Sequence, residues 1–304
     1  MPQAKRPTYD WQLRTRTLTL GPRTLIMAIL NLTPDSFSDG GQFNTPEAAL
    51  TQALKLLDEG TDILDLGGES TRPNATPITP AEEQSRTIPT IKAILKQRPD
   101  AILSIDTHHA DTARAAVEAG AEIVNDVSGH TWDPAMPATC ADLRCGTILM
   151  HTRGTPQTWP TLPPLVPETI LPLVLTGLLQ SIATATAAGL PLNQIVIDPG
   201  FGFGKIGPAN FTLLAHLHQL QSLQLPILAG LSRKSFLKNS VPPTKPGVPH
   251  LDSETRVPTS ETLLHATTAA NTAAILAGAH ILRVHDVTPA REAAAIADAI
   301  LNHS

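Results

Sequence analysis

The chain alternates short apolar runs with segments whose apolar residues recur at helical spacing, and this alternation occurs eight times. Each apolar run ends in a polar or charged residue within a turn rich in Gly or Pro. Strands that alternate with helices are typical of a parallel sheet. Eight such units close a (β/α)8 barrel, so we predict an α/β fold of the TIM-barrel class. The predicted strands are residues 24–31, 62–69, 102–106, 123–126, 147–151, 195–198, 227–232 and 281–286.

Helical periodicity fills the intervals between these strands. Thr79 is a suitable N-cap for the second helix, with Pro80 at its first position. Residues 1–22 precede the first strand, and their alternating Thr and Leu predict a short antiparallel hairpin that closes the bottom of a barrel formed by 23–304. The predicted helices are 45–59, 80–96, 110–119, 133–141, 169–188, 210–221, 260–276 and 289–301.

Three segments lack periodicity, namely 31–44, 154–167 and 239–258. Each follows the carboxyl end of a predicted strand, so we expect all three to lie as loops over the mouth of the barrel.

Composition narrows the possible functions. A length of 304 residues fits one barrel, and a net charge of −5 without a cluster of basic and aromatic residues disfavours nucleic acid. We find no run of about 18 apolar residues and no signal peptide, so we expect no membrane segment and a cytoplasmic location. Cys140 and Cys145 are too few for a disulfide framework or a zinc set, and we expect buried or helix-surface thiols.

The chemistry of a TIM barrel lies at the carboxyl ends of its strands. Asp106, Asn125 and Asp198 end three predicted strands, so their side chains should converge at one height. Two carboxylates with no cation between them repel, and the trio therefore favours a flat, donor-rich heterocycle such as an aminopyrimidinone. Two alternatives stay open: Asp106 caps the next helix, and Asp198 bonds only the turn that follows it.

Basic residues form a second group. Lys234 follows the seventh predicted strand, and Arg283 and His285 alternate on the eighth, so that both point into the mouth. Barrels often bind phosphate near these strands, which makes the pair a candidate phosphate clamp. In the alternative, Arg283 makes a structural ion pair inside the barrel and His285 is an ordinary core histidine.

Further motifs have weaker meanings. The loops 31–41 and 69–73 carry glycine hinges, a Phe and an Arg, as lids do, although plain surface loops remain possible. The glycines of 198–205 do not fit a phosphate-loop spacing, so we interpret them as allowing the backbone to approach a ligand. The pairs His108–His109 and His216–His218 lack metal partners at a useful spacing, and we expect surface or helix-start histidines.

Taken together, the motifs resemble the dihydropteroate synthase family over nearly the whole chain. Two departures are Asn74, where the family has Gly, and the loops 154–167 and 239–258, which follow no family pattern. The matching runs are 31–41 (NLTPDSFSDGG), 67–73 (GGESTRP), 104–107 (SIDT), 125–129 (NDVSG), 150–151 (MH), 198–205 (DPGFGFGK), 232–236 (SRKSF) and 283–287 (RVHDV).

The resemblance implies a transferase of folate biosynthesis. Such an enzyme joins 6-hydroxymethyl-7,8-dihydropterin pyrophosphate to 4-aminobenzoate and releases pyrophosphate, with Mg²⁺ as cofactor. The implied catalytic residues are Asp106, Asn125, Asp198 and Lys234, which with Met150 also hold the pterin. Asn31, Arg283 and His285 would take the pyrophosphate, with the metal at Asn31. The aminobenzoate pocket would comprise Phe37, Thr71, Arg72, Pro73, Gly202, Phe203 and Ser235, and loop closure would involve Thr33, Asp35 and Ser36.

The resemblance also implies a homodimer, for which 262–276 is our candidate contact because it is rich in Ala and Leu on more than one face. Two rival functions remain. One is a pterin-binding methyltransferase barrel, which would share the floor residues but needs neither the phosphate clamp nor the 232–235 block, and these two features favour the synthase. The other is a pterin carrier or a barrel that has lost activity, which requires that divergence of the loops has broken their closure.

Overall fold

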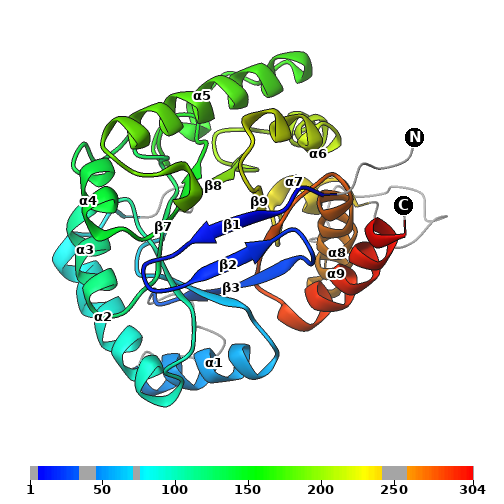
Figure 1. Ribbon diagram of the computed structural model, residues 1–304. Coiled ribbons are helices and arrows are strands. Elements are labelled where there is room, and N and C mark those ends of the chain that lie inside the picture. The colour runs from blue at the N-terminus through cyan, green and yellow to red at the C-terminus, as the bar shows by residue number, and fades with distance from the viewer. Residues whose placement is uncertain (1–5, 34–45, 71–75, 242–258, 304) are drawn as a thin grey trace, which may run out of the picture.

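The computed structural model describes residues 6–33, 46–70, 76–241 and 259–303. Eight parallel strands surround one axis, with helices on the outside (Figure 1), which confirms the predicted fold class. The sheet order is β8-β7-β6-β5-β4-β3-β10-β9, and a bridge between Ile197 and Ile227 joins its two ends. The strands are β3 Leu25–Asn31, β4 Ile63–Gly67, β5 Leu103–Asp106, β6 Ile123–Asp126, β7 Gly146–Met150, β8 Ile195–Asp198, β9 Leu228–Ala229 and β10 Ile281–Val284.

The helices follow the predicted order, and Thr79 caps α2 by accepting a hydrogen bond from the Glu82 amide at 3.2 Å. The helices are α1 Pro46–Asp58, α2 Pro80–Gln97, α3 Ala110–Glu118, α4 Met136–Leu143, α5 Pro167–Ala187, α6 Ala209–Ala215, α7 Ser235–Lys238, α8 Ser260–Leu276 and α9 Val287–Asn302, with 3-10 turns η2 Trp159–Thr161, η3 Leu192–Gln194 and η4 Leu217–Leu223.

An antiparallel hairpin, β1 Tyr9–Gln12 with β2 Thr17–Leu20, lies across the amino end of the barrel, as predicted (Figure 1). Trp11 is its central plug: the side chain is 1% exposed and packs in a cluster with inward-facing strand residues such as Met27 and Ile148. The indole Nε1 donates to the carbonyl of Gln194 at 2.9 Å. Chemistry is therefore confined to the opposite, carboxyl end. The domain division at residue 22 stays a prediction.

Three predicted elements differ most from the structure. The helix expected over 210–221 ends at Ala215 and continues as η4, whose leucines recur every three residues, the repeat of a 3-10 helix. The strand expected over 227–232 is only Leu228–Ala229, preceded by the bridge at Ile227, and the chain turns further on at Arg233, which has a positive φ of 57°. The helix expected from 133 begins at Met136 because the Asp133 carboxylate accepts backbone bonds from Ala110 and Ala135.

Helix α5 bears on the expectation of no membrane segment. Within the described chain, α5 is long and apolar enough, by length and composition alone, to cross a membrane, and only 28% of its most apolar window is buried. One face of α5 is nevertheless buried at helical spacing, through Ile170, Val174, Leu178, Ser181 and Ala185. That pattern is typical of an outer helix of a barrel. Cys140 and Cys145 are buried free thiols, as expected.

Candidate active site

The floor of the site lies at the carboxyl ends of β5, β6 and β8. Asp106 is in register with Asn125, and Met150 with Asp198. Asn125 and Asp198 are each 4% exposed, and Met150 is also buried. A methyl group built on Gly230 would meet Asp198 Oδ2 on one side and Arg283 Cβ on the other, so Asp198 faces the same interior as Arg283. The structure thus brings the predicted trio to one level.

A buried cation lies between Asp106 and Asp65, an acid of β4 that the sequence analysis did not single out. Arg283 donates from Nη2 to Asp106 Oδ2 and from Nε to Asp65 Oδ2, the latter at 2.6 Å. Asn125 Nδ2 donates to the same Asp65 oxygen at 3.0 Å. Asp65 is fully buried in β4, and its Oδ1 has no hydrogen-bond partner among the described residues. Arg283 therefore separates Asp106 from Asp65, and the expected joint grip of Asp106 and Asp198 on a ligand stays a prediction.

Asp65 is the residue that sequence reasoning missed. It lies within a predicted strand rather than at its end, and only its charge inside the apolar run ILDLG could have indicated a role. Arg283 takes the ion-pair role that was the alternative to a phosphate clamp. The Asp106 side chain bonds Arg283, and Asp198 Oδ1 accepts the Gly200 amide at 2.7 Å, so the turn bond expected as an alternative for Asp198 does form.

Burial sets the protonation of these acids. It raises the pKa of Asp106 to about 7, an effect that the Arg283 charge opposes. Burial also raises the pKa of Asp198, against the Gly200 amide and the Lys234 charge. For Arg283, burial lowers the pKa, but Asp65 and Asp106 outweigh it and the net shift is upward. The guanidinium therefore stays charged while Asp106 is poised to gain or lose a proton near neutrality.

Lys234 forms one wall. Its Nζ lies 3.9 Å from the centroid of the Phe203 ring, a cation–π contact, and Phe203 meets Trp159 edge-on. Burial, and then the Arg283 charge, lowers the pKa of Lys234 to about 8. Gly202 has a φ of 82° and would bring an added Cβ within 3.4 Å of the lysine chain. Ser235 is exposed at the start of α7.

The glycine-rich turn after β8 has a structural role that we did not predict. Added Cβ atoms at Gly200 and Gly204 would lie 2.0 Å and 2.2 Å from the carbonyl oxygens of His151 and Arg153. These glycines thus let the chain approach its own backbone, whereas we had expected them to face a ligand. Buried Lys205 fixes the turn by donating to the carbonyls of His151, Gly200 and Phe203 at 2.9, 2.7 and 3.3 Å.

The three residues predicted to bind pyrophosphate, Asn31, Arg283 and His285, do not all line one cavity. Asn31 and His285 line a cavity of about 940 Å³ together with Arg233, whereas Arg283 reaches the floor acids. β10 ends at Val284, so His285 lies one residue beyond the strand. His285 Nδ1 contacts Ser232 Oγ at 3.0 Å. Burial, and then the Arg283 charge, lowers the pKa of His285 to about 3, which leaves the ring neutral. Lys55 and Arg233 are the cations that line this cavity, and Arg233 is paired with Asp286.

Several candidates lie outside the described residues: Asp35, Ser36, Phe37, Thr71, Arg72 and Pro73. Thr33 is buried immediately before the first of these segments.

Comparisons with known proteins agree with this geometry. Residues 27–285 match the family described as "Pterin binding enzyme". The dihydropteroate synthase of Synechocystis is 40% identical over 292 residues, which cover 96% of this chain and 92% of the relative. The structure of Xanthomonas albilineans dihydropteroate synthase with 4-aminobenzoic acid is 39% identical, with a TM-score of 0.82 and coverage of 97% and 98%. The same enzyme in complex with 7,8-dihydropteroate is 37% identical, with a TM-score of 0.80 and the same coverage.

The chain therefore belongs to the pterin-binding enzymes and, within them, to the dihydropteroate synthase family.

We predict that Asp65→Asn destabilises the fold through the buried ion pair. The variant keeps the shape but removes one of two negative charges from Arg283, so the free energy of unfolding should fall by about 2–4 kcal/mol. Urea unfolding measures this change. Asp58→Asn is the matched control, because Asp58 pairs with Arg98 at the surface and should change stability by less than about 0.5 kcal/mol. Equal stabilities of the two variants would contradict the role of Asp65.

Proposed function

We propose that this protein condenses 6-hydroxymethyl-7,8-dihydropterin pyrophosphate with 4-aminobenzoate to give 7,8-dihydropteroate and pyrophosphate. The observation that carries the proposal is the meeting of Asp106, Asn125, Asp198 and Lys234 at one end of one barrel. Relatives of nearly the same length bear the name dihydropteroate synthase, and one was solved with 4-aminobenzoic acid and with 7,8-dihydropteroate.

The floor suits the pterin ring. Asp106 and Asp198 accept hydrogen bonds from ring and amino N–H groups, and Asn125 both donates and accepts. Lys234 donates to the carbonyl and ring-nitrogen edge, while Met150 supplies an apolar contact. Arg283 already occupies one oxygen of Asp106, so it orients that carboxylate before the ligand binds. Preorganisation of this kind lowers the cost of binding.

The cavity between α1 and α9 suits the pyrophosphate. Asn31 and His285 lie on its wall, and Lys55 and Arg233 supply positive charge beside the acidic Glu47, Glu59 and Asp286. Asn31 supplies an amide oxygen beside Gly67 and Asp106, a hard donor of the kind that Mg²⁺ accepts together with substrate phosphates. When bound, Mg²⁺ neutralises charge on the departing pyrophosphate. The positive charge of Arg283, which is paired with Asp65 and Asp106, also attracts the pyrophosphate.

The reaction then needs no covalent nucleophile. Loss of pyrophosphate leaves a cationic methylene on an electron-rich ring, and the anionic Asp198 stabilises it by hydrogen bonding and by its field. The amine of 4-aminobenzoate attacks that carbon from a pocket formed by Gly202, Phe203 and Ser235 with Phe37, Thr71, Arg72 and Pro73. Closure of the first loop, through Thr33, Asp35 and Ser36, keeps water from the carbon.

Pyrophosphate release tests the function. We expect release only when both substrates and Mg²⁺ are present, and a strong loss when a chelator is added. Asp198→Ala should slow turnover about a hundredfold, because a contact of about 3 kcal/mol at the transition state is removed. Asp58→Ala, at the surface, is the control. No release by the wild type would refute the synthase function, and a normal rate in Asp198→Ala would remove that residue from the mechanism.

The pKa of Asp106 predicts a pH dependence of pterin binding. Because the free carboxyl has a pKa of about 7 and the ligand needs the ionised form, affinity should be constant above pH 7. Below pH 7 it should fall toward tenfold per pH unit, since a proton must be lost on binding. Calorimetry with 7,8-dihydropteroate between pH 5.5 and 8.5 measures this slope. Asp106→Asn should bind weakly at every pH, and an unchanged slope in that variant would exclude Asp106 as its source.

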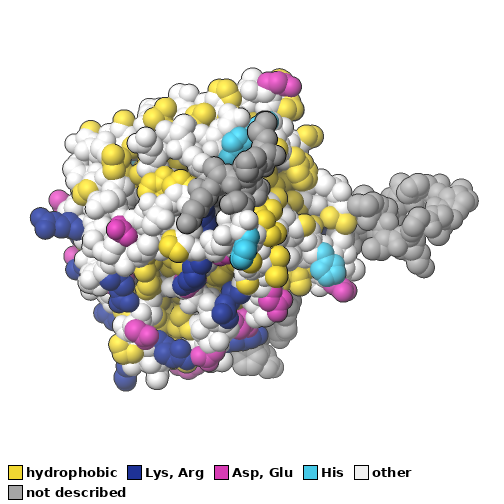
Figure 2. Space-filling model, turned by 45° about the vertical axis from the view of Figure 1, so that its right-hand side comes forward, with side chains coloured by type: hydrophobic (Ala, Val, Ile, Leu, Met, Phe, Trp, Pro, Cys, Tyr) yellow, Lys and Arg dark blue, Asp and Glu magenta, His cyan; other side chains and the backbone are white. Residues whose placement is uncertain are grey.

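We also propose a homodimer through α8 and a cytoplasmic location. The outer face of α8 exposes His265, Ala269 and Ala273, and α9, which packs on α8, exposes Ile296 and Ile300. Figure 2 turns this side of the barrel toward the viewer and shows apolar side chains among charged ones. Two buried free thiols fit a reducing compartment.

The mass in solution tests the dimer. We expect twice the chain mass at micromolar concentration for the wild type and a monomer for Ala269→Arg, whose long charged side chain does not fit a close contact. Leu192→Arg, at an exposed site on η3, should stay dimeric. A wild-type monomer would refute this proposal.

A further inference from the structure

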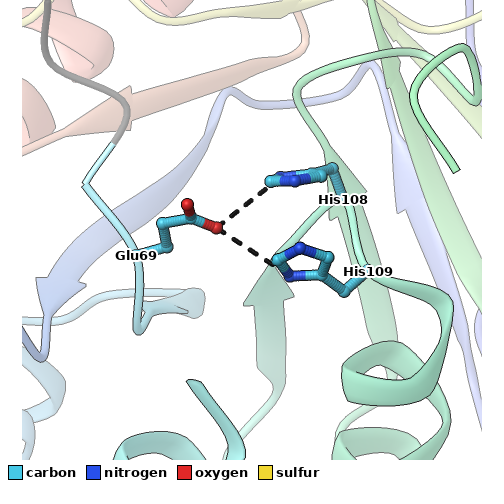
Figure 3. A group of neighbouring side chains, drawn as sticks. All are labelled: Glu69, His108 and His109. Atoms are coloured by element: carbon cyan, nitrogen blue, oxygen red, sulfur yellow. Dashed lines mark ion pairs between the residues drawn. The ribbon is translucent and has the colours of Figure 1, made fainter. Parts of the chain in front are cut away.

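Glu69, His108 and His109 gather beside the barrel mouth, apart from the proposed substrate contacts (Figure 3). Glu69 follows the end of β4, and the two histidines lie between β5 and α3. The Nδ1 atoms of both histidines lie 3.8 Å from Glu69 Oε2. One donor atom from each residue falls within 4.8 Å of the other two. The histidine pair therefore has the partner that sequence spacing failed to reveal.

The carboxylates around this group have unused acceptors. Glu69 Oε2 is buried without a hydrogen-bond partner among the described residues, and so is Oε1 of Glu83 behind it. Glu83 is fully buried, and its Oε2 contacts His109 Nδ1 at 3.0 Å and accepts from Thr107 at 2.9 Å. Buried polar oxygens are rarely left unpaired in native proteins. A cation bound by this group would satisfy the Glu69 oxygen and offset the negative charge of the two carboxylates.

Neighbouring side chains orient both histidines. His108 lies against His109, with ring centroids 4.0 Å apart, and Trp132 packs against His108 edge-on at 5.0 Å. His109 Nδ1 contacts Glu83 Oε2 at 3.0 Å, so Nε2 is the nitrogen of this ring that would bind a metal. A carboxylate behind a ligating histidine is the usual outer partner in metal sites.

We propose that Glu69, His108 and His109 bind a divalent transition-metal ion of the zinc class. Bonds of about 2.1 Å in a tetrahedral site place donor atoms about 3.4 Å apart. The donor atoms of this group lie within 4.8 Å of one another, so side-chain rotation must bring them closer by up to about 1.4 Å. Two imidazoles and one carboxylate favour Zn²⁺, Co²⁺ or Ni²⁺ over Mg²⁺, which prefers oxygen. The fourth position is left for water or for Glu83. The site is separate from Asn31, where the pyrophosphate metal is proposed.

A metal here would clamp two segments. Glu69 continues from β4 and His109 caps α3, so the ion ties the exit of one strand to the start of the helix after the next strand. Binding only to the folded chain must raise its thermal stability. Zn²⁺ should therefore increase the melting temperature of the wild type, and the increase should continue with the logarithm of free Zn²⁺ above the dissociation constant.

Co²⁺ is the direct probe. The full-length chain, without a histidine tag and freed of metal by a chelator, should take up one equivalent of Co²⁺ with a visible absorption band that Zn²⁺ abolishes and millimolar Mg²⁺ does not. Calorimetry with Zn²⁺ should show at least a tenfold weaker affinity for Glu69→Gln, His108→Ala and His109→Ala. His216→Ala/His218→Ala is the matched control, because these two helix-end rings are 6.3 Å apart, outside the group, and their loss should change nothing.

Two results would overturn the proposal. One is a wild type that binds no stoichiometric Co²⁺ or Zn²⁺. The other is binding that survives Glu69→Gln and both histidine substitutions, or that disappears in the His216/His218 control. Circular dichroism and melting of each metal-free variant show whether it folds. Since three separate side chains are tested, a fold defect in one leaves the other two to decide.

Discussion

The site depends on one buried ion cluster, in which Arg283 of β10 is held between Asp65 of β4 and Asp106 of β5. Without Arg283, two acids would face each other in a low-dielectric interior, where their negative charges repel. With Arg283 present, Asp65 is ion-paired and also accepts a hydrogen bond from Asn125. The pKa of Asp106 then lies at about 7. The cluster thus fixes the shape of the floor and decides its charge.

The barrel makes this cluster possible by closing its other end. The hairpin plug around Trp11 fills the amino end with apolar side chains, so polar groups concentrate at the carboxyl end. After β8, Lys205, Gly200 and Gly204 hold the turn that follows Asp198. Neither group touches a proposed substrate, yet both set the position of residues that do. Packing at the amino end of the barrel therefore supports the position of the proposed catalytic residues at the carboxyl end.

Strand ends could be predicted from the sequence, because a parallel barrel places them at one height, and this gave Asp106, Asn125, Asp198 and Lys234. Ion pairs between distant strands of the barrel could not be predicted from the sequence. Arg283 and Asp65 are 218 residues apart, and nothing local distinguishes an arginine that binds phosphate from one that binds a buried acid. The Glu69–His108–His109 group was missed for the same reason. The 3-10 turn η4 is different: its threefold leucine spacing was visible in the sequence and was misread as α-helix.

The most direct test of the floor is a crystal structure of the protein with 7,8-dihydropteroate. We expect the pterin ring between Asp106 and Asp198, with an N–H group bonded to each carboxylate, Lys234 at the carbonyl edge, and Arg283 still paired with Asp65. A pterin bound elsewhere on the barrel, or an Arg283 that leaves both acids to bind the ligand itself, would contradict the arrangement on which the proposed catalysis rests.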